Sequence, residues 1–157
     1  MAAYRFLTTW CLDAPVERVW DAVYAAERWP AWWPGVERAA TVEEGDENDI
    51  GCVWSFAWRS RLPYTITFES ETTRVERPHV MEGRTRGDLN GIGSWRFYSG
   101  SEGTAAVYRW DVATGPRWMN AIAPLARPAF VWNHDLIMRR GAEGLARLLG
   151  ARLVARS

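Results

Sequence analysis

One histidine in the last third of the chain is the residue best suited to acid–base chemistry. His134 recurs with Phe130 and Ile137 at helical spacing, which places it on the apolar stripe of a predicted helix, while Asn133 and Asp135 point to other faces. An imidazole in that position could transfer a proton or anchor a ligand. The alternative, which we prefer, is a structural histidine bonded to a neighbouring strand, because most buried polar groups are satisfied in this way.

Two tyrosines and one arginine are the remaining candidates for chemistry. Tyr64 and Tyr108 could each donate a hydroxyl to a ligand carbonyl, or each could pack with its hydroxyl bonded locally, and the sequence favours neither. Arg86 could hold an enolate or a carboxylate. We prefer a surface or turn-stabilising role for Arg86 and for the nearby Asp88, because these residue types are usually exposed.

The common catalytic and metal-binding motifs are absent from the sequence. There is no nucleophile elbow, no phosphate-binding loop and no His-Glu-x-x-His pattern. The acidic stretch 43–49 lacks the ligand order of an EF-hand and predicts a solvated hairpin tip. Cys11 and Cys52 are too far apart for a metal or redox motif. We therefore expect no metal and no cofactor.

Composition limits the partners. The 157 residues fit one domain, 1–157, and the formal net charge is zero, with all 19 basic residues being Arg. We expect no nucleic-acid partner, since no basic excess is present. No apolar run reaches 18 residues and no signal peptide is evident, so we expect no stable membrane insertion and a cytoplasmic location. The chain also has 11 Trp, which suit both cores and ligand pockets.

Alternating apolar residues predict an antiparallel sheet. The first strand covers 4–12, and Pro15 then starts a short helix that extends to about Ala26. A second short helical turn fits between Pro30 and Pro34. A turn at 87–91 separates two of the later strands. The further strands are expected at 36–44, 52–59, 64–73, 80–86, 94–99 and 104–114.

A long helix follows the last of these seven strands. It is expected from about Ala129 to Leu149, where Gly150 ends it, and Pro124 and Pro128 predict a kinked or separate segment at 117–126. This helix is the only element long enough to cover the apolar face of the sheet. The fold class is therefore α+β, a seven-stranded curved antiparallel sheet wrapped around a long C-terminal helix.

A single helix cannot fill the concave side of such a sheet, so we expect a cavity there. Trp20 and Trp29 are expected to pack the short helices on the sheet, and Trp32 and Trp33 to border the cavity mouth. The predicted ligand-binding residues are Trp54, Phe56, Trp58, Tyr64, Phe68, Trp95, Tyr108, Trp110, Phe130, His134 and Ile137.

Several short blocks resemble one known superfamily. They are Asp-Ala-Pro-Val-Glu-Arg-Val-Trp at 13–20, Trp-Pro-Ala-Trp-Trp-Pro-Gly at 29–35, the turn 87–91 with Trp95, Tyr-Arg-Trp-Asp at 108–111 and Trp-Asn-His-Asp at 132–135. In these blocks the chain resembles the helix-grip, START-like (SRPBCC) superfamily, which includes START lipid-transfer domains, plant pollen allergens and the bacterial polyketide cyclase/dehydrase family. The resemblance covers almost the whole chain.

The resemblance implies a helix-grip fold and an internal site for a small hydrophobic molecule such as a lipid, a polyketide or an aromatic metabolite. It leaves three functions open, because fold does not determine function. The first is ligand binding. The second is a polyketide cyclase or dehydratase that closes a ring by intramolecular aldol reaction, with His134, Tyr64 or Tyr108 moving protons. The third is a stress-type or regulatory domain without catalysis. A monomer or a homodimer is expected.

Overall fold

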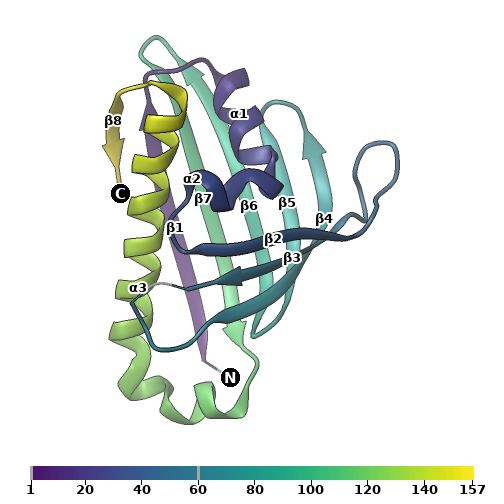
Figure 1. Ribbon diagram of the computed structural model, residues 1–157, viewed down its shortest axis with the longest axis vertical. Helices are drawn as coiled ribbons and strands as arrows, with labels where there is room; N and C mark the ends of the chain where they lie inside the picture. The colour runs from purple at the N-terminus through teal and green to yellow at the C-terminus, as the bar shows by residue number, and fades with distance from the viewer. Residues whose placement is uncertain (1, 60) are drawn as a thin grey trace.

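An eight-stranded antiparallel sheet curves around one long helix in the computed structural model, which describes residues 2–59 and 61–157. The strand order is β2-β3-β4-β5-β6-β7-β1-β8, and Figure 1 shows β2 and β3 crossing in front of the long β1, β6 and β7 strands. The strands are β1 (Ala3–Leu12), β2 (Val36–Glu43), β3 (Val53–Trp58), β4 (Ile66–Glu76), β5 (Val80–Gly87), β6 (Leu89–Gly100), β7 (Gly103–Thr114) and β8 (Leu153–Arg156). The helices are α1 (Val16–Tyr24), the 3-10 turn η1 (Ala26–Arg28), α2 (Trp29–Trp32) and α3 (Arg117–Leu149).

Two details of the predicted sheet are wrong. An eighth strand, β8, follows α3 and pairs antiparallel with the edge of β1, where Cys11 lies opposite Ala155. Four residues are too few for an alternating pattern to reveal a strand. In addition β6 begins at Leu89 and not at Ser94, because Gly91 lies in the ladder opposite Val112 instead of in a turn. The hairpin between β5 and β6 is correspondingly tight.

Helix α3 is longer than predicted. It begins at Arg117 and passes through Pro124 and Pro128 as one element. Figure 1 shows its first turns bending away from the axis of the rest, so the expected segment is kinked and not separate. Among the described residues no helix, including this one of 33 residues, has an apolar stretch suited to crossing a membrane.

The interior faces of the elements follow the sequence pattern. On β1 the alternate residues Tyr4, Phe6, Thr8, Trp10 and Leu12 are all buried, as their period of two predicts. The helix α1 likewise buries the residues that recur at helical spacing, Val16, Val19, Trp20 and Val23. These faces form two apolar clusters. One surrounds Trp10, Trp33, Trp95 and Leu145, and the other surrounds Tyr4, Phe6, Leu89 and Phe130.

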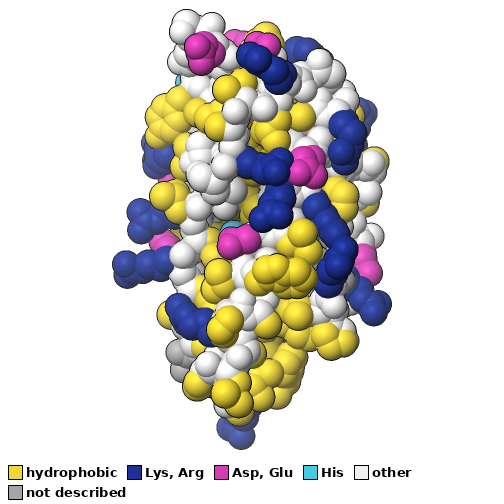
Figure 2. Space-filling view, turned by 90° about the vertical axis from the view of Figure 1, so that its left-hand side faces the viewer, with side chains coloured by type: hydrophobic (Ala, Val, Ile, Leu, Met, Phe, Trp, Pro, Cys, Tyr) yellow, Lys and Arg dark blue, Asp and Glu magenta, His cyan; other side chains and the backbone are white. Residues whose placement is uncertain are grey.

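The outer side of α3 differs from its inner side. Near its start α3 exposes Trp118, Ile122 and Leu125. Trp132, which lies about two turns after Leu125, is half exposed. Figure 2 faces this side of the molecule and shows hydrophobic side chains gathered at the lower end, where Figure 1 places the beginning of α3. This surface is separate from the buried face that carries Phe130, His134 and Ile137.

Two glycines let the later half of α3 approach the helices that precede β2. A Cβ at Gly144 would overlap the carbonyl oxygen of Trp32, and a Cβ at Gly141 would lie 2.5 Å from the indole of Trp33. Only hydrogen at these positions leaves room for that contact. The position of α3 across the sheet therefore depends on two small residues.

We expect Gly144→Ala to destabilise the protein by about 1–3 kcal/mol, because α2 and α3 must separate to admit one methyl group. Gly100→Ala is the matched control, since the nearest atom to its added Cβ is 4.0 Å away. Urea unfolding followed by circular dichroism measures both. Equal free energies of unfolding for the two variants would contradict the close contact.

Candidate functional site

A cavity of about 410 Å³ lies between the sheet and the helices, and residues of both apolar clusters line it. Ten of the eleven residues predicted to bind a ligand are on its walls. They are Trp54, Phe56, Trp58, Phe68, Trp95, Tyr108, Trp110, Phe130, His134 and Ile137. The structure thus brings together side chains from β3, β4, β6, β7 and α3.

Tyr64 is the eleventh predicted residue, and it lies elsewhere. It precedes β4, which begins at Ile66, and its ring packs edge-on against Trp118 at a centroid distance of 5.4 Å. Burial raises the pKa of its hydroxyl. Tyr64 is not among the described residues that line the cavity, because the alternation that predicted its direction begins only after it.

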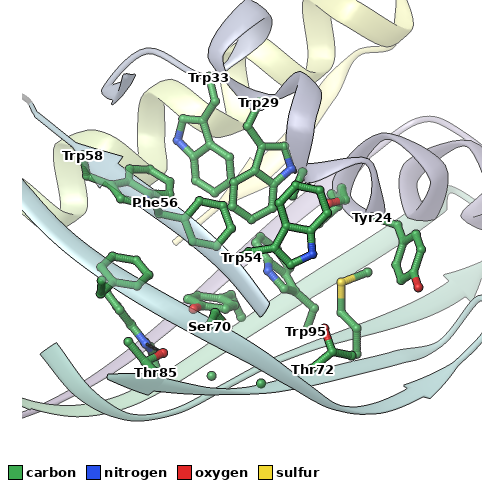
Figure 3. Close-up of a pocket in the computed structure, with 18 of the residues that line it drawn as sticks. Tyr24, Trp29, Trp33, Trp54, Phe56, Trp58, Ser70, Thr72, Thr85 and Trp95 are labelled. Atoms are coloured by element: carbon green, nitrogen blue, oxygen red, sulfur yellow. Dashed lines mark hydrogen bonds between the residues drawn. The ribbon is translucent and has the colours of Figure 1, made fainter. Parts of the chain in front are cut away.

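The walls of the cavity are largely aromatic. Trp29 stacks on Phe56 at 5.2 Å, and Trp33 meets Trp58 edge-on at 5.0 Å. Figure 3 shows these rings gathered with Trp54 on one side of the space, opposite the strands that carry Trp95. Ring pairs of this geometry stabilise each other beyond the area they bury. The aromatic wall is therefore held in place by its own contacts.

Trp29 and Trp33 contribute more than the sequence predicted. Trp29 was expected to be packing and Trp33 to be at the mouth, yet both line the cavity and Trp33 is almost fully buried. The Trp33 indole donates a hydrogen bond of 2.9 Å to the carbonyl of Ile137 on α3. Trp20 packs on Phe97 of the sheet as expected. Trp32 instead borders a separate surface hollow next to Gly144.

Hydroxyl groups form part of the sheet side of the cavity. Ser70 and Thr72 follow Phe68 with a period of two on β4, and Thr85 comes from β5 (Figure 3). The Thr85 hydroxyl accepts a hydrogen bond of 3.3 Å from the indole of Trp110. Sequence reasoning missed these residues, although continuing the alternation of β4 past Phe68 would have found the first two.

The acidic hairpin tip between β2 and β3 closes onto α1. The hydroxyl of Tyr24 donates a hydrogen bond to the Asp49 carboxylate. The pKa of Tyr24 is raised to about 12, mainly by burial and to a smaller extent by the hydrogen bond to Asp49. Asp46 accepts bonds from the backbone N–H groups of Asn48 and Ile50 and so shapes the loop. The tip is solvated, as predicted, but it also forms one side of the cavity.

His134 is buried and stacks on Phe6 of β1 at a centroid distance of 3.7 Å. Its Nδ1 lies 3.4 Å from the Asp135 carboxylate, and its Nε2 is buried without a partner. Burial lowers its pKa to about 4, against the opposing effect of Asp135. The imidazole is therefore neutral near pH 7. Its partner is a carboxylate on its own helix and not the strand group that we expected.

The neighbouring Asn133 also faces inward, which corrects the expectation that it points to another face. It is buried, it lines the cavity, and its Oδ1 has no hydrogen-bond partner. Two consecutive residues of α3 thus bring buried polar atoms without partners to one cavity. Buried polar groups in this condition are uncommon in proteins, and each requires a physical explanation.

Tyr108 lies against Trp95 with ring centroids 4.6 Å apart. A Cβ at Gly93 would come within 2.7 Å of the Tyr108 hydroxyl, so glycine makes room for the phenol. Burial raises the pKa of this hydroxyl. Tyr108 therefore stays protonated and can donate a hydrogen bond inside the cavity.

The other charged candidates have structural roles. Arg86 is exposed, with its Nε 4.0 Å from Glu69, and Asp88 accepts a 2.9 Å bond from the backbone N–H of Thr67. Both belong to the surface and the turn, as we preferred. Within the described part of the chain, no three His, Cys, Asp or Glu side chains are grouped so that they could hold a metal ion.

The sequence matches the family described as polyketide cyclase / dehydrase and lipid transport over residues 6–150, and the chain belongs to that family. It has no match among the curated proteins.

Several solved structures share the fold. The Zhui aromatase/cyclase from Streptomyces sp. R1128 is 16% identical, with a TM-score of 0.74 and coverage of 92% of each chain. A protein from Thermus thermophilus, TTHA0849, is 18% identical, with a TM-score of 0.68 over 94% of this chain and 99% of the other. The di-domain ARO/CYC StfQ of the steffimycin biosynthetic pathway is 17% identical, with a TM-score of 0.69 over 94% of this chain. The chain spans only 52% of StfQ and 48% of a second di-domain ARO/CYC, BexL.

The low pKa of His134 has a consequence for stability. The folded state binds its proton near pH 4 and the unfolded state near 6.5, so the unfolded state binds more protons between these values. The free energy of unfolding therefore falls as the pH falls through this window, by up to about 1.4 kcal/mol per pH unit from this group.

We expect His134→Phe, which keeps an aromatic ring against Phe6, to remove this contribution. Urea unfolding of both proteins at several values between pH 7 and pH 4 measures the difference between their stabilities. The wild type should lose stability relative to the variant as the pH falls. A constant difference across the window would mean that His134 is not buried as the structure has it.

Proposed function

We propose that this protein binds a small, mostly apolar molecule inside the cavity. The observation that carries the proposal is a space of about 410 Å³ with aromatic walls and a few hydroxyl groups. Small-molecule sites typically have this size, this apolar character and a small number of polar groups that orient the ligand. The family description, which names both polyketide cyclases and lipid transport, supports the same conclusion.

The driving force would be burial of the ligand's apolar surface, worth roughly 25 cal/mol per Å² before the costs of association. The cavity limits one of those costs. Trp29 already packs against both Trp33 and Phe56, so few side chains need to be ordered when a ligand enters. Preorganised walls of this kind raise affinity without adding contacts.

Cyclase or dehydratase chemistry is the second candidate, and the family favours it. An aldol closure requires one group that removes a proton from a carbon atom and another that stabilises the resulting enolate. A base works best when its pKa is near the working pH, whereas burial lowers the pKa of His134 to about 4 and raises that of Tyr108. His134 and Tyr108 are therefore better suited to orienting a folded polyketide substrate and excluding water than to strong acid–base catalysis. The geometry therefore supports binding more directly than catalysis.

A substitution that fills the cavity tests the binding proposal. We expect Thr72→Trp, which places an indole among the lining residues, to weaken binding of the neutral dye Nile red by about tenfold or more through loss of buried contact area. Thr73→Trp is the matched control, because Thr73 is the next residue of β4 and is exposed. The enhancement of dye fluorescence on titration gives both dissociation constants.

Saturable binding to the wild type and to Thr73→Trp, lost in Thr72→Trp, is the expected result. Two outcomes oppose the proposal. One is absence of saturable binding to the wild type, and the other is equal affinity in the two variants, which would place the dye on the outer surface.

A further inference from the structure

We propose that the cavity selects uncharged aromatic molecules that donate a hydrogen bond, such as phenols and enols, and rejects carboxylates. This inference rests on the binding function proposed above and specifies its ligand class. Two independent features support it, the sign of the charges around the cavity and the type of polar atom that is left without a partner at α3.

The charged side chains that line the cavity are all acidic within the described part of the chain. They are Asp21, Glu27, Glu44, Asp49 and Glu82. Arg74 and Arg96 approach Glu82 at 3.6 and 3.1 Å, so that carboxylate is paired, but neither arginine is among the lining residues. Arg77 packs over the ring of Tyr24 at 4.4 Å and is likewise not a lining residue.

This arrangement disfavours an anionic ligand. A carboxylate that enters an apolar cavity loses its hydration, and the loss is severe unless a positive charge compensates it. His134 offers no compensation because it is neutral near pH 7. Trp58 has a buried indole N–H without a partner, but this donor is uncharged. The carboxylates that line the cavity would also repel an approaching anion.

The unpartnered atoms at α3 are acceptors. Nδ1 of His134 lies beside the Asp135 carboxylate, which can only accept, so the proton is on Nδ1 and Nε2 carries a lone pair. Oδ1 of Asn133 is an acceptor as well. Both side chains are more than nine-tenths buried, both line the cavity, and neither atom has a partner. A ligand hydroxyl that reached either atom would satisfy it, whereas a methyl ether would leave both unsatisfied.

Three naphthalenes that differ in one substituent test the inference at neutral pH. The probes are 2-naphthol, 2-methoxynaphthalene and 2-naphthoate, each titrated against bound Nile red. We expect 2-naphthol to bind about tenfold more tightly than 2-methoxynaphthalene, as one added hydrogen bond allows. We expect 2-naphthoate to bind more weakly than either neutral compound, because its charge is not compensated.

Variants assign each preference to its residues. His134→Phe and Asn133→Leu each remove one acceptor from the cavity wall. In the variant that lacks the acceptor used by the ligand, the ratio of the affinities for 2-naphthol and 2-methoxynaphthalene should fall towards one. Glu27→Gln combined with Glu44→Gln should strengthen 2-naphthoate binding several-fold relative to 2-naphthol binding at low salt. Glu102→Gln, on the exposed turn between β6 and β7, is the matched control and should alter neither.

The outcomes separate the two proposals. Equal affinity for 2-naphthol and 2-methoxynaphthalene, or tightest binding of 2-naphthoate, overturns the ligand class and leaves the binding function standing. Failure of all three compounds and of Nile red to bind the folded wild type overturns both. The expected order, with the naphthol preference lost in at least one of the two α3 variants, supports the ligand class. A preference that is kept in both variants overturns it.

Discussion

The contact between Trp33 and α3 determines most of this structure. The Trp33 indole N–H bonds to the carbonyl of Ile137, and its ring lies where a side chain at Gly141 would have to be. This fixes the height and rotation of α3 above the sheet, and with it the inward direction of His134. Because the same ring also packs on Trp29 and Trp58, the position of the helix and the shape of the cavity wall depend on one another.

The interior is left open for a related reason. Large, rigid rings contact one another around the space, as Trp29 does with Phe56 and Trp95 does with Tyr108, and they cannot move inward without losing those contacts. The same geometry isolates polar groups from water, and the low pKa of His134 and the raised pKa of Tyr108 both follow from that burial. Shape and chemistry of the cavity therefore have one cause.

The sequence was informative where its pattern is periodic. The alternation on β3, β6 and β7 predicted inward side chains, and the structure places them on the cavity walls, while the helical stripe placed His134 and Ile137 there as well. It failed where contacts are long-range. The inward position of Asn133 depends on how α3 is rotated against the sheet, and the partner of Tyr24 comes from a hairpin 25 residues away. The strand β8 has no pattern of its own and exists because β1 offers it an edge.

The most direct test of a ligand held inside the cavity is the set of Trp indole resonances in ¹⁵N-edited NMR, since each of the 11 Trp reports its own surroundings. On saturation with a neutral aromatic ligand, we expect shifts in the indoles that line the cavity and none at the exposed Trp118 and Trp132. The lining indoles are those of Trp29, Trp33, Trp54, Trp58, Trp95 and Trp110. Shifts confined to Trp118 and Trp132, with the lining indoles unchanged, would show that the ligand binds on the outer side of α3 and would contradict an internal site.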